Sequence, residues 1–282
     1  MNYRHAFHAG NFADVVKHAV LARVVAHLRE KQSAFRIIDT HAGSGLTRLT
    51  GPEARRTGEW RQGIGRLLAA PLDPEIHGLL APYLQAIARY NAGGRLLAYP
   101  GSPLLALSWL RPQDRLIACE LAPAAAAALA RSLGKDRRAK VIAIDGWTAL
   151  TAYVPPRERR GLVLIDPPFE APGELDRLAE HLARAHRKWP TGIYLLWYPI
   201  KNVAETERFA RNIARLGIPK ILRAEIRIAA RQDETLIGSG VLLVNPPWKL
   251  ETELQSLLPA LAGVLRRDRQ GAARLDWLAA EK

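Results

Sequence analysis

The sequence predicts an α/β fold in which helices cover both faces of a mostly parallel β-sheet. Apolar runs of strand length alternate with helical stretches over most of the 282 residues, which is typical of such sheets. Several expected strands end in an acidic residue, and only a short link separates the last two strands. The sequence therefore predicts one large domain, residues 1–282, with its binding site where the strands end.

A helix is expected first, over residues 11–31. Asn11 is a suitable N-cap, Asp14 suits the positive end of the helix dipole, and apolar residues then recur at helical spacing. Residues 35–39 follow as a strand that leads into a glycine turn. Residues 46–98 break the alternation, because they contain short amphipathic stretches and no convincing strand. We expect them to form an inserted helical subdomain.

Alternation of strands and helices returns after residue 98. The six further expected strands are 115–120, 140–144, 162–166, 192–198, 221–228 and 240–245, with helices over 122–133, 173–188 and 249–266. About 11 residues join the last two strands, too few for a crossover helix, so these strands should form an antiparallel hairpin. The prediction is a seven-stranded, mostly parallel sheet with an antiparallel last strand.

The composition of the chain indicates its class of partner and excludes several kinds of site. The net charge is +14, which favours a polyanionic partner such as nucleic acid, because lysine and arginine release counterions from phosphates. The single cysteine, Cys119, excludes an intrachain disulfide and a cysteine-based zinc site. No apolar run reaches ~18 residues, and the N-terminus lacks the apolar stretch of a signal peptide. We therefore expect a monomeric cytoplasmic enzyme with no membrane association.

Four consecutive strands of the expected parallel sheet end in an acidic residue: Asp39, Glu120, Asp145 and Asp166. The carboxyl ends of parallel strands meet at one edge of a sheet, where doubly wound folds bind their ligands. Buried strands do not need terminal acids for stability, and clustered carboxylates repel one another. Their coincidence at one edge therefore indicates a binding site.

A ligand that contains adenosine suits this edge. The Gly43-x-Gly45 loop lets the backbone approach a ligand closely, Glu120 could accept hydrogen bonds from both ribose hydroxyls, and the Asp145-Gly146 end could border the adenine. Taken singly, the glycines and Asp145 fit plain turns, and Glu120 fits a helix cap. An NAD site would use the same parts. Its ribose acid should, however, follow the glycines by ~20 residues, whereas Glu120 follows Gly45 by 75, a gap that the insertion explains.

The motif Asp166-Pro-Pro-Phe169 distinguishes an NAD site from a site for another cofactor that contains adenosine. The exocyclic amine of adenine is a poor nucleophile, because its lone pair is delocalised into the ring. Two hydrogen-bond acceptors would free that lone pair, and the Asp166 carboxylate and the carbonyl of Pro167 in a rigid loop could supply them. Phe169 could stack on the base. Asp/Asn-Pro-Pro-aromatic is the signature of S-adenosylmethionine-dependent methyltransferases that act on amines.

A second copy of this signature occurs at Asn245-Pro-Pro-Trp248. It follows the expected antiparallel strand, away from the edge where the four acids should lie. We therefore interpret it as a structural stop before the last helix. If the strand order were different, the two motifs would exchange roles.

Several blocks of sequence, spanning residues 3 to 251 in order, carry a closer resemblance: YRHAFHAGNFADVVKHAVL, DTHAGSG, RTGEW, YPGSPLLA, LIDPPFE, TGIYLLWYPI and NPPWKLE. They resemble the bacterial 23S ribosomal RNA adenine-N6 methyltransferases of the RlmJ family. The resemblance implies the Rossmann-like fold of class I methyltransferases with a helical insertion after the first strand, which agrees with residues 46–98.

The resemblance also implies roles for individual residues. Asp166 would be the catalytic acceptor for the adenine amine and would lie against the cofactor. The other implied cofactor contacts are His18, His41, Ser102, Glu120, Asp145 and Gly146. The implied contacts of the target base are Tyr3, His5, Lys17, Pro167 and Phe169. Phe169 stands where the family often has tyrosine, so the stacking ring is kept and the hydroxyl is lost.

The expected function is S-adenosylmethionine-dependent methylation of N6 of a specific adenine in 23S ribosomal RNA, by direct transfer to a flipped base. Arg55, Arg56 and Arg61 of the insertion are expected to contact RNA phosphates. The alternatives are a DNA adenine methyltransferase and a non-catalytic RNA-binding protein with a vestigial cofactor pocket. We expect no metal, because no carboxylate or cysteine completes a ligand set around His5, His8 and His18.

Overall fold

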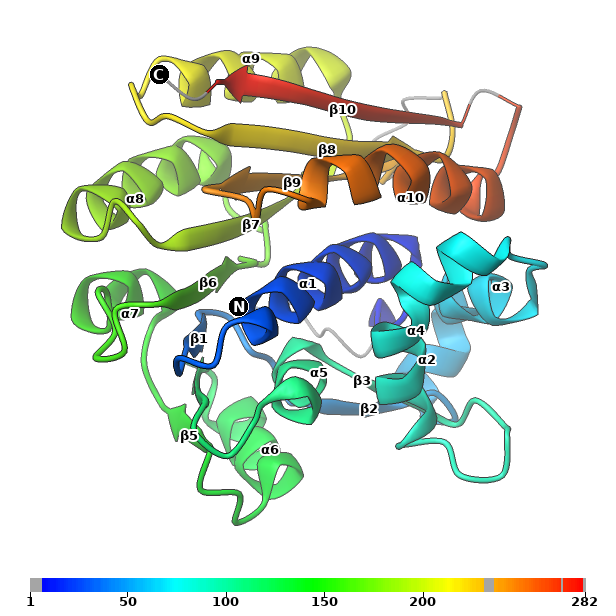
Figure 1. The fold of residues 1–282 in the computed structure, drawn as a ribbon. Coiled ribbons are helices and arrows are strands. Elements are labelled where there is room, and N and C mark those ends of the chain that lie inside the picture. The colour runs from blue at the N-terminus through cyan, green and yellow to red at the C-terminus, as the bar shows by residue number, and fades with distance from the viewer. Residues whose placement is uncertain (1–6, 231–235, 270, 281–282) are drawn as a thin grey trace.

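A computed structural model describes residues 7–230, 236–269 and 271–280 of the chain (Figure 1). Its central sheet has eight strands in the order β10-β8-β9-β7-β6-β1-β4-β5. The strands are β1 Arg36–Asp39, β4 Arg115–Cys119, β5 Ala139–Ile142, β6 Gly161–Ile165, β7 Ile193–Ile200, β8 Ile221–Arg227, β9 Gly238–Val244 and β10 Ala272–Ala279. Strands β7, β6, β1, β4 and β5 are parallel neighbours, whereas β9 is antiparallel to β7 and β8. The predicted mostly parallel α/β fold is confirmed.

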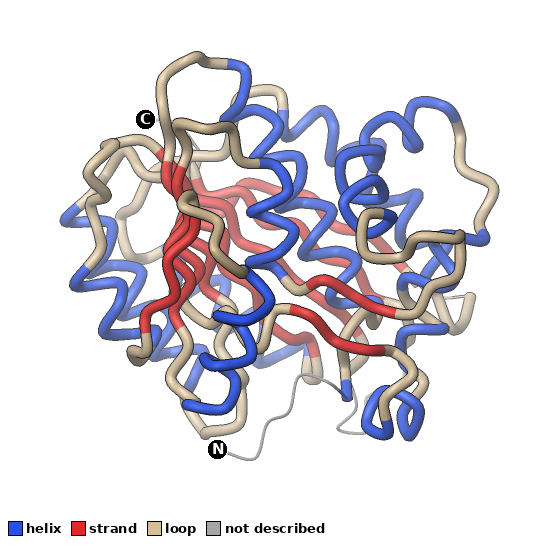
Figure 2. The backbone as a smooth tube through the Cα atoms, turned by 90° about the horizontal axis from the view of Figure 1, so that it is seen from below, coloured by secondary structure: helices blue, strands red, loops and turns tan. Residues whose placement is uncertain are grey.

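Helices cover both faces of this sheet (Figure 2). One face carries α1 Phe12–Glu30, α5 Ser102–Trp109, α6 Pro123–Leu133 and α10 Leu250–Leu265, and the other carries α7 Gly146–Ala152, α8 Glu174–Lys188 and α9 Val203–Ala214. Side chains alternate between two hydrophobic cores, as in Ile37 and Ile38 of β1, because successive residues of a strand point to opposite faces. The central strands are therefore buried on both sides.

The first helix begins and ends where its sequence predicts. The Asn11 side chain caps α1 by accepting a hydrogen bond from the Asp14 backbone N–H at 3.0 Å. Most of the helix is buried, including Lys17 and His18, because it packs between the sheet, α4 and α10. Its N-terminal turn consequently lies among other elements rather than in solvent.

Residues 46–98 contain four short helices and one strand. The helices are α2 Pro52–Thr57, the 3₁₀ helix η2 Glu59–Arg61, α3 Ile64–Ala69 and α4 Pro74–Ala88. The prediction that this stretch contains no strand is wrong, since β2 Leu46–Arg48 pairs antiparallel with β3 Ala98–Pro100. This β2–β3 ribbon closes the insertion at its base, because the chain enters the insertion through β2 and leaves it through β3.

The insertion packs directly on the start of α1. The Ile64 backbone N–H donates to the Gly10 carbonyl at 2.9 Å. A Cβ added to Gly63 would lie 2.2 Å from that same carbonyl oxygen, so only glycine fits there. The Asn11 side chain also donates to Glu59 Oε2 at 3.0 Å. The insertion thus contacts the N-terminus of α1 through both backbone and side-chain atoms.

The sheet also differs from its predicted seven strands at one edge. The seven expected strands are all present, and β8 and β9 form the expected antiparallel pair. The eighth strand, β10, pairs antiparallel with β8 and was not predicted. Its side chains are mostly half-buried, and it carries Arg274 and Asp276, so its apolar pattern is weak. Among the described residues, no helix combines the length and the apolar character that crossing a bilayer requires.

Candidate active site

The four predicted acids lie at one edge of the sheet. Strands β6, β1, β4 and β5 are parallel neighbours in that order, so their carboxyl ends are adjacent. Asp39 is the last residue of β1, and Glu120, Asp145 and Asp166 follow β4, β5 and β6. The arrangement expected from the sequence is therefore present.

Glu120 is bound to the glycine loop. Its Oε2 accepts a hydrogen bond from the Gly43 N–H at 2.9 Å, and its Oε1 accepts one from the Ala122 N–H at 2.8 Å. A carboxylate has about four lone-pair sites, so both oxygens keep a site for another donor. A Cβ added to Gly43 would have no atom within 4 Å, so open space lies beside this loop. A ligand can reach both the backbone and the carboxylate here.

Asp39 lies beneath the same edge and is fully buried. The Ser102 hydroxyl donates to its Oδ2 at 2.6 Å. Burial raises the pKa of Asp39 to about 7, the Ser102 hydrogen bond opposes that rise, and the charge of Asp166 adds to it. Gly101, next to Ser102, donates its backbone N–H to the Gly45 carbonyl at 2.7 Å, which brings α5 against the glycine loop.

His41 and Gly146 are in contact. A Cβ on Gly146 would lie 2.6 Å from His41 Nε2 and 2.4 Å from the Thr40 carbonyl oxygen, so the space admits only glycine. Burial lowers the pKa of His41 to about 4, so the imidazole is neutral at physiological pH. Asp145 caps α7, where Thr148 donates both its N–H, at 2.9 Å, and its hydroxyl, at 3.0 Å, to Oδ2. Asp145 is thus the N-cap of α7, a role that the sequence analysis, which allowed only a plain turn there, did not predict.

Lys17 joins α1 to the end of β6. Its ammonium forms an ion pair with Oδ2 of Asp166 and a second with Oδ1 of Asp14, at 2.9 Å in the latter case. The side chains of Lys17 and Asp14 are only 5% and 4% exposed, and that of Asp166 is 16% exposed. Burial alone would lower the pKa of Lys17, but the charges and hydrogen bonds of both carboxylates outweigh it and raise that pKa. Lys17 therefore remains a hydrogen-bond donor.

The Asp-Pro-Pro-Phe loop follows β6 directly. Pro167 is buried, and Phe169 has φ +52°, a left-handed conformation that is strained for an aromatic residue. The Phe169 ring packs edge-on against Trp197 of β7, with centroids 5.5 Å apart, and Lys17 Nζ lies 5.6 Å from the centre of the Trp197 ring. Strained backbone of this kind persists where neighbours fix it, and it is concentrated at functional sites.

His18 lies inside the protein. Its Nδ1 is 2.7 Å from the Tyr99 hydroxyl, which is 2.8 Å from the Tyr83 hydroxyl. Its ring stacks on that of Tyr99, with centroids 5.7 Å apart. The contacts run from α1 through β3 to α4, and they hold the helix that carries Lys17 against the insertion. The polar contacts described here for His18 and Asp145 do not involve another predicted site residue.

Two predicted base contacts, Tyr3 and His5, lie outside the described residues. Within the described part of the chain, no group of three or more His, Cys, Asp or Glu side chains could hold a metal ion. His8, which the sequence analysis weighed as a ligand, instead has Nδ1 3.0 Å from both carboxylate oxygens of Glu59. This hydrogen bond raises the pKa of His8.

Asn245, in the second copy of the motif, lies at the opposite end of the strands from the four acids, where the parallel strands begin. Since β9 is antiparallel to β7, its end faces the start of β7, and the Asn245 amide donates to the Pro190 and Gly192 carbonyls at 2.7 and 2.8 Å. Helix α10 begins at Leu250, five residues later. Trp248 is 86% exposed. The interpretation of this motif as a structural stop agrees with its position.

Two residues near the loop were missed by the sequence analysis as parts of the site. Asp14 was assigned only to the helix dipole, although Asp14-x-x-Lys17 is an i,i+3 pair that could have suggested an ion pair. Trp197 lies in an apolar strand, where an aromatic residue is ordinary, and no local signal indicated that it contacts Phe169. The partner of Trp197 is distant in sequence, whereas Asp14 had a sufficient local explanation as an acid at the start of a helix.

The chain is similar to known proteins over its whole length. A model of the family described as "Ribosomal RNA large subunit methyltransferase D, RlmJ" matches residues 32–279. Over the full length of both chains, the protein is 39% identical to ribosomal RNA large subunit methyltransferase J of Escherichia coli K12 and 38% identical to that of Haemophilus influenzae Rd. A crystal structure of a Legionella pneumophila protein matches with TM-score 0.87 and 33% identity, over 95% of this chain and 98% of its own.

Proposed function

The chain belongs to the RlmJ family of ribosomal RNA large subunit methyltransferases, and we propose that it methylates the exocyclic N6 of one adenine in 23S ribosomal RNA. Membership makes the chain a ribosomal RNA methyltransferase. We propose three points beyond family membership: the methylated atom, the target base and the methyl donor, S-adenosylmethionine. A ribosomal substrate also implies that the enzyme works in the cytoplasm.

One observation carries the choice of an amine as the acceptor: the ion pair between Lys17 and Asp166 at the start of the Asp-Pro-Pro-Phe loop. Lys17 occupies Oδ2 of Asp166, so Oδ1 is the oxygen that can accept an N–H of the adenine amine. The Pro167 carbonyl supplies the second acceptor from a backbone with no rotamer to order. Two acceptors turn the amine lone pair toward the methyl donor.

The residues of the carboxyl edge fit S-adenosylmethionine, which supplies an electrophilic methyl group when bound. Glu120 keeps acceptor sites for two ribose hydroxyls, and the space beside Gly43 leaves its backbone approachable. The full proposed cofactor set is His18, His41, Ser102, Glu120, Asp145, Gly146 and Asp166. His41 is neutral, so it would add no positive charge to a site that holds a cationic cofactor.

Lys17 acts as a positioning group in this proposal. Its raised pKa keeps the ammonium protonated, so it cannot remove a proton from the adenine amine. Instead it holds Asp166 in one orientation while Asp14 fixes the ammonium from the other side. No strong base is required, because the amine can release its proton after transfer. We also assign Tyr3, His5, Pro167 and Phe169 to the target base, with the Phe169 ring stacking on it.

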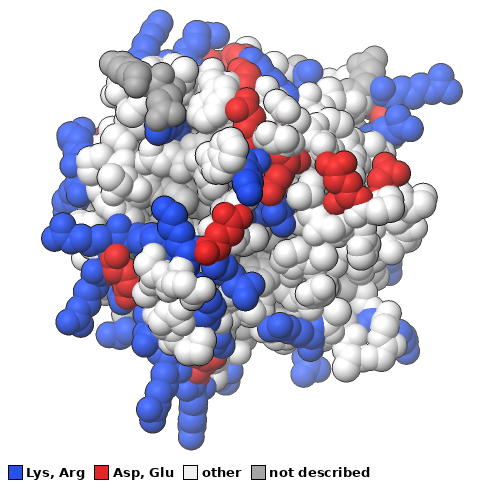
Figure 3. Space-filling view, in the orientation of Figure 1, with Lys and Arg blue, Asp and Glu red and all other residues white. Residues whose placement is uncertain are grey.

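Positive charge provides the affinity for RNA. In the view of Figure 3, lysine and arginine side chains project along the left and lower margins of the molecule, and the side of the inserted helices shows fewer of them. Phosphate contacts fix the register of an RNA without reading its sequence. The basic surface is thus proposed to hold the strand while one adenine leaves its stack and enters the site.

The test is methyl transfer to 23S ribosomal RNA from a strain that lacks this protein. The proposal predicts one N6-methyladenine per RNA, found by mass mapping, and no activity on duplex DNA. Asp166→Ala should reduce the rate by at least about 100-fold while the melting temperature shows that the fold persists. The matched control is Asn245→Gly in the second motif, where the left-handed φ of +52° suits glycine, and it should retain activity. Preference for duplex DNA, or full activity in the Asp166 variant, would refute the proposal.

A further inference from the structure

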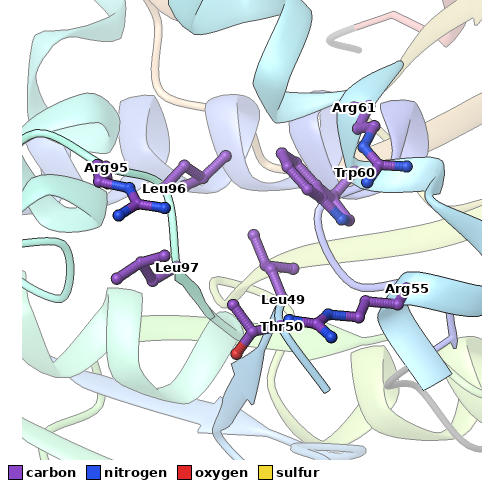
Figure 4. A pocket seen from close by; sticks show the side chains of 8 residues that line it. All are labelled: Leu49, Thr50, Arg55, Trp60, Arg61, Arg95, Leu96 and Leu97. Carbon is purple, nitrogen blue, oxygen red and sulfur yellow. The ribbon is translucent and has the colours of Figure 1, made fainter. Parts of the chain in front are cut away.

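The insertion contains a cavity of about 450 Å³ that the proposed methyl transfer does not use (Figure 4). Its lining includes Leu49, Arg55, Trp60, Arg61, Arg95 and Leu97, which come from the segment after β2, from α2 and η2, and from the segment before β3. The volume falls within the range of pockets that hold small ligands, about 300–1,000 Å³. The cavity is therefore large enough to be a binding site in its own right.

The polar lining of the cavity is cationic. Figure 4 shows Arg95 on one side and Arg55 and Arg61 on the other, and no acidic side chain lines the cavity. None of the ion pairs within the described part of the chain involves these three arginines. Three guanidinium groups that have no counterion in the described part of the chain favour an anionic ligand, and phosphate matches their planar geometry.

The cavity also offers an aromatic surface. Trp60 lines it, and the Arg61 guanidinium lies 5.2 Å from the centre of the Trp60 ring. Trp60 Nε1 is buried and has no hydrogen-bond acceptor among the residues that the structure describes. Leu49 and Leu97 add apolar surface. A flat ring beside guanidinium groups is the combination on which proteins stack unpaired bases next to a phosphate backbone.

The β2–β3 ribbon connects this cavity to the active site. One end of the ribbon is at the glycine loop, where Gly101 N–H donates to the Gly45 carbonyl. The other end opens into the cavity, because Leu49 follows β2 and Leu97 precedes β3. The paired strands are three residues long, roughly 10 Å. A strand of RNA whose target base is in the active site could therefore reach the cavity within a few nucleotides.

We propose that this cavity binds one unstacked nucleotide of the substrate RNA, near the target adenine in the strand. The base of that nucleotide packs on Trp60, and its flanking phosphates pair with Arg55, Arg61 and Arg95. The proposal rests on the proposed function, since it takes the RNA as the ligand. It adds a second point of attachment, which would fix the strand on both sides of the flipped base.

The test measures binding of fluorescein-labelled hexauridylate to the full-length protein, without cofactor. Uridine is not the target base, so the active site does not contribute its specific contacts. Trp60→Ala should weaken binding about 5- to 100-fold without changing the salt dependence, because stacking involves no counterions. Trp60→Phe should stay within about threefold of the unaltered protein. The matched control is Trp248→Ala, which removes an exposed tryptophan at the opposite edge of the sheet.

The arginines should give the complementary result. Arg55→Gln with Arg95→Gln should reduce the slope of log affinity against log salt by about 0.7 to 1.4, for one or two phosphates on a single strand. Both side chains are exposed, so these changes should leave the fold intact. Arg187→Gln with Arg215→Gln, at the exposed ends of α8 and α9, removes the same two charges and is the charge-matched control. Trp60 packs partly against the core, so the melting temperature of each variant is measured alongside.

Unchanged binding by a folded Trp60→Ala variant would overturn the proposal. Uridine monophosphate that competed as well as hexauridylate would also overturn it, because the site would then recognise a free nucleotide. Failure of the proposed function would look different: ribosomal RNA would receive no methyl group while the two binding effects persisted. Methyl transfer without either effect would remove only the cavity from the account.

Discussion

Replacing Asp39 by asparagine should stabilise the protein at alkaline pH. Asp39 is fully buried at the end of β1, and its carboxyl group accepts hydrogen bonds from the Ser102 hydroxyl and from the His41 backbone N–H. Burial raises its pKa from an ordinary value of 3.8 to about 7. In the folded state the protonated form therefore predominates up to about pH 7. Asparagine has nearly the same shape and is neutral at every pH.

The size of the effect follows from linkage. Each pKa unit corresponds to about 1.4 kcal/mol, so a rise of about three units costs roughly 4 kcal/mol of folding free energy once Asp39 is ionised. Because the folded-state pKa is raised, the stability due to protonation is complete below about pH 4 and is lost as the pH rises through 7. With an unfolding entropy of about 0.6 kcal/mol/K for 282 residues, the variant should melt about 7 °C higher than the unaltered protein at pH 8.

Asp114→Asn is the matched control, because Asp114 is equally buried but its pKa is lowered. It accepts hydrogen bonds from the Arg111 side chain and from the Phe35 N–H. Its contribution is present at neutral pH and lost as the pH falls below 4, so this variant should be destabilised at pH 8. The assay is thermal unfolding of the cofactor-free protein from pH 4.5 to 8.5. A melting difference for Asp39→Asn that does not grow with pH would refute the reasoning.

Three further results are expected. Asp14→Asn should lower kcat about 10-fold or more with little change in KM for RNA, because Lys17 loses one of its two fixed carboxylates. A wild-type kcat would show that the ion pair with Asp14 does not contribute to catalysis. Gly146→Ala should weaken cofactor binding, measured by calorimetry, because the new Cβ would displace the His41 ring; unchanged affinity would place the cofactor elsewhere. Phe169→Tyr should stay within about threefold in kcat/KM, whereas Phe169→Gly should lose about 10- to 100-fold although it relieves a positive φ, and equal activity of the two would exclude stacking.

The sheet could be predicted wherever a strand is buried on both faces. Such strands, for example β6 Gly161–Ile165, read as continuous apolar runs, and their order along the chain fixed the parallel topology. The edge strand β10 escaped prediction, because its pattern mixes half-buried apolar residues with charged ones such as Asp276. Asp276 is satisfied by Arg223 of β8, 53 residues away, and no local pattern reports such a partner. Strand β2 escaped because three residues carry too little periodicity.

The candidate site divides in the same way. Asp166 could be singled out because Asp-Pro-Pro-Phe is contiguous, and Glu120 because it follows a strand. The ion pair between Asp166 and Lys17 spans 149 residues and was not predicted, and Lys17 itself entered the predicted site only through a family resemblance. Asp14 and Trp197 complete the surroundings of Lys17, but each has an ordinary local explanation. Geometry between distant segments is what the pattern of one sequence does not encode.

The contact between Gly63 and Gly10 bears on attempts to shorten the enzyme. Excising the residues between β2 and β3 would look like the removal of an accessory module that joins the sheet only through two short strands. It would also remove the surface against which Gly10 and Asn11 pack at the N-terminus of α1, about two turns before Lys17. A truncated protein would therefore lose the alignment of the Lys17 ammonium as well as the cavity proposed to bind RNA. The insertion and the amino-terminal helix should be transplanted, swapped or redesigned only as one unit.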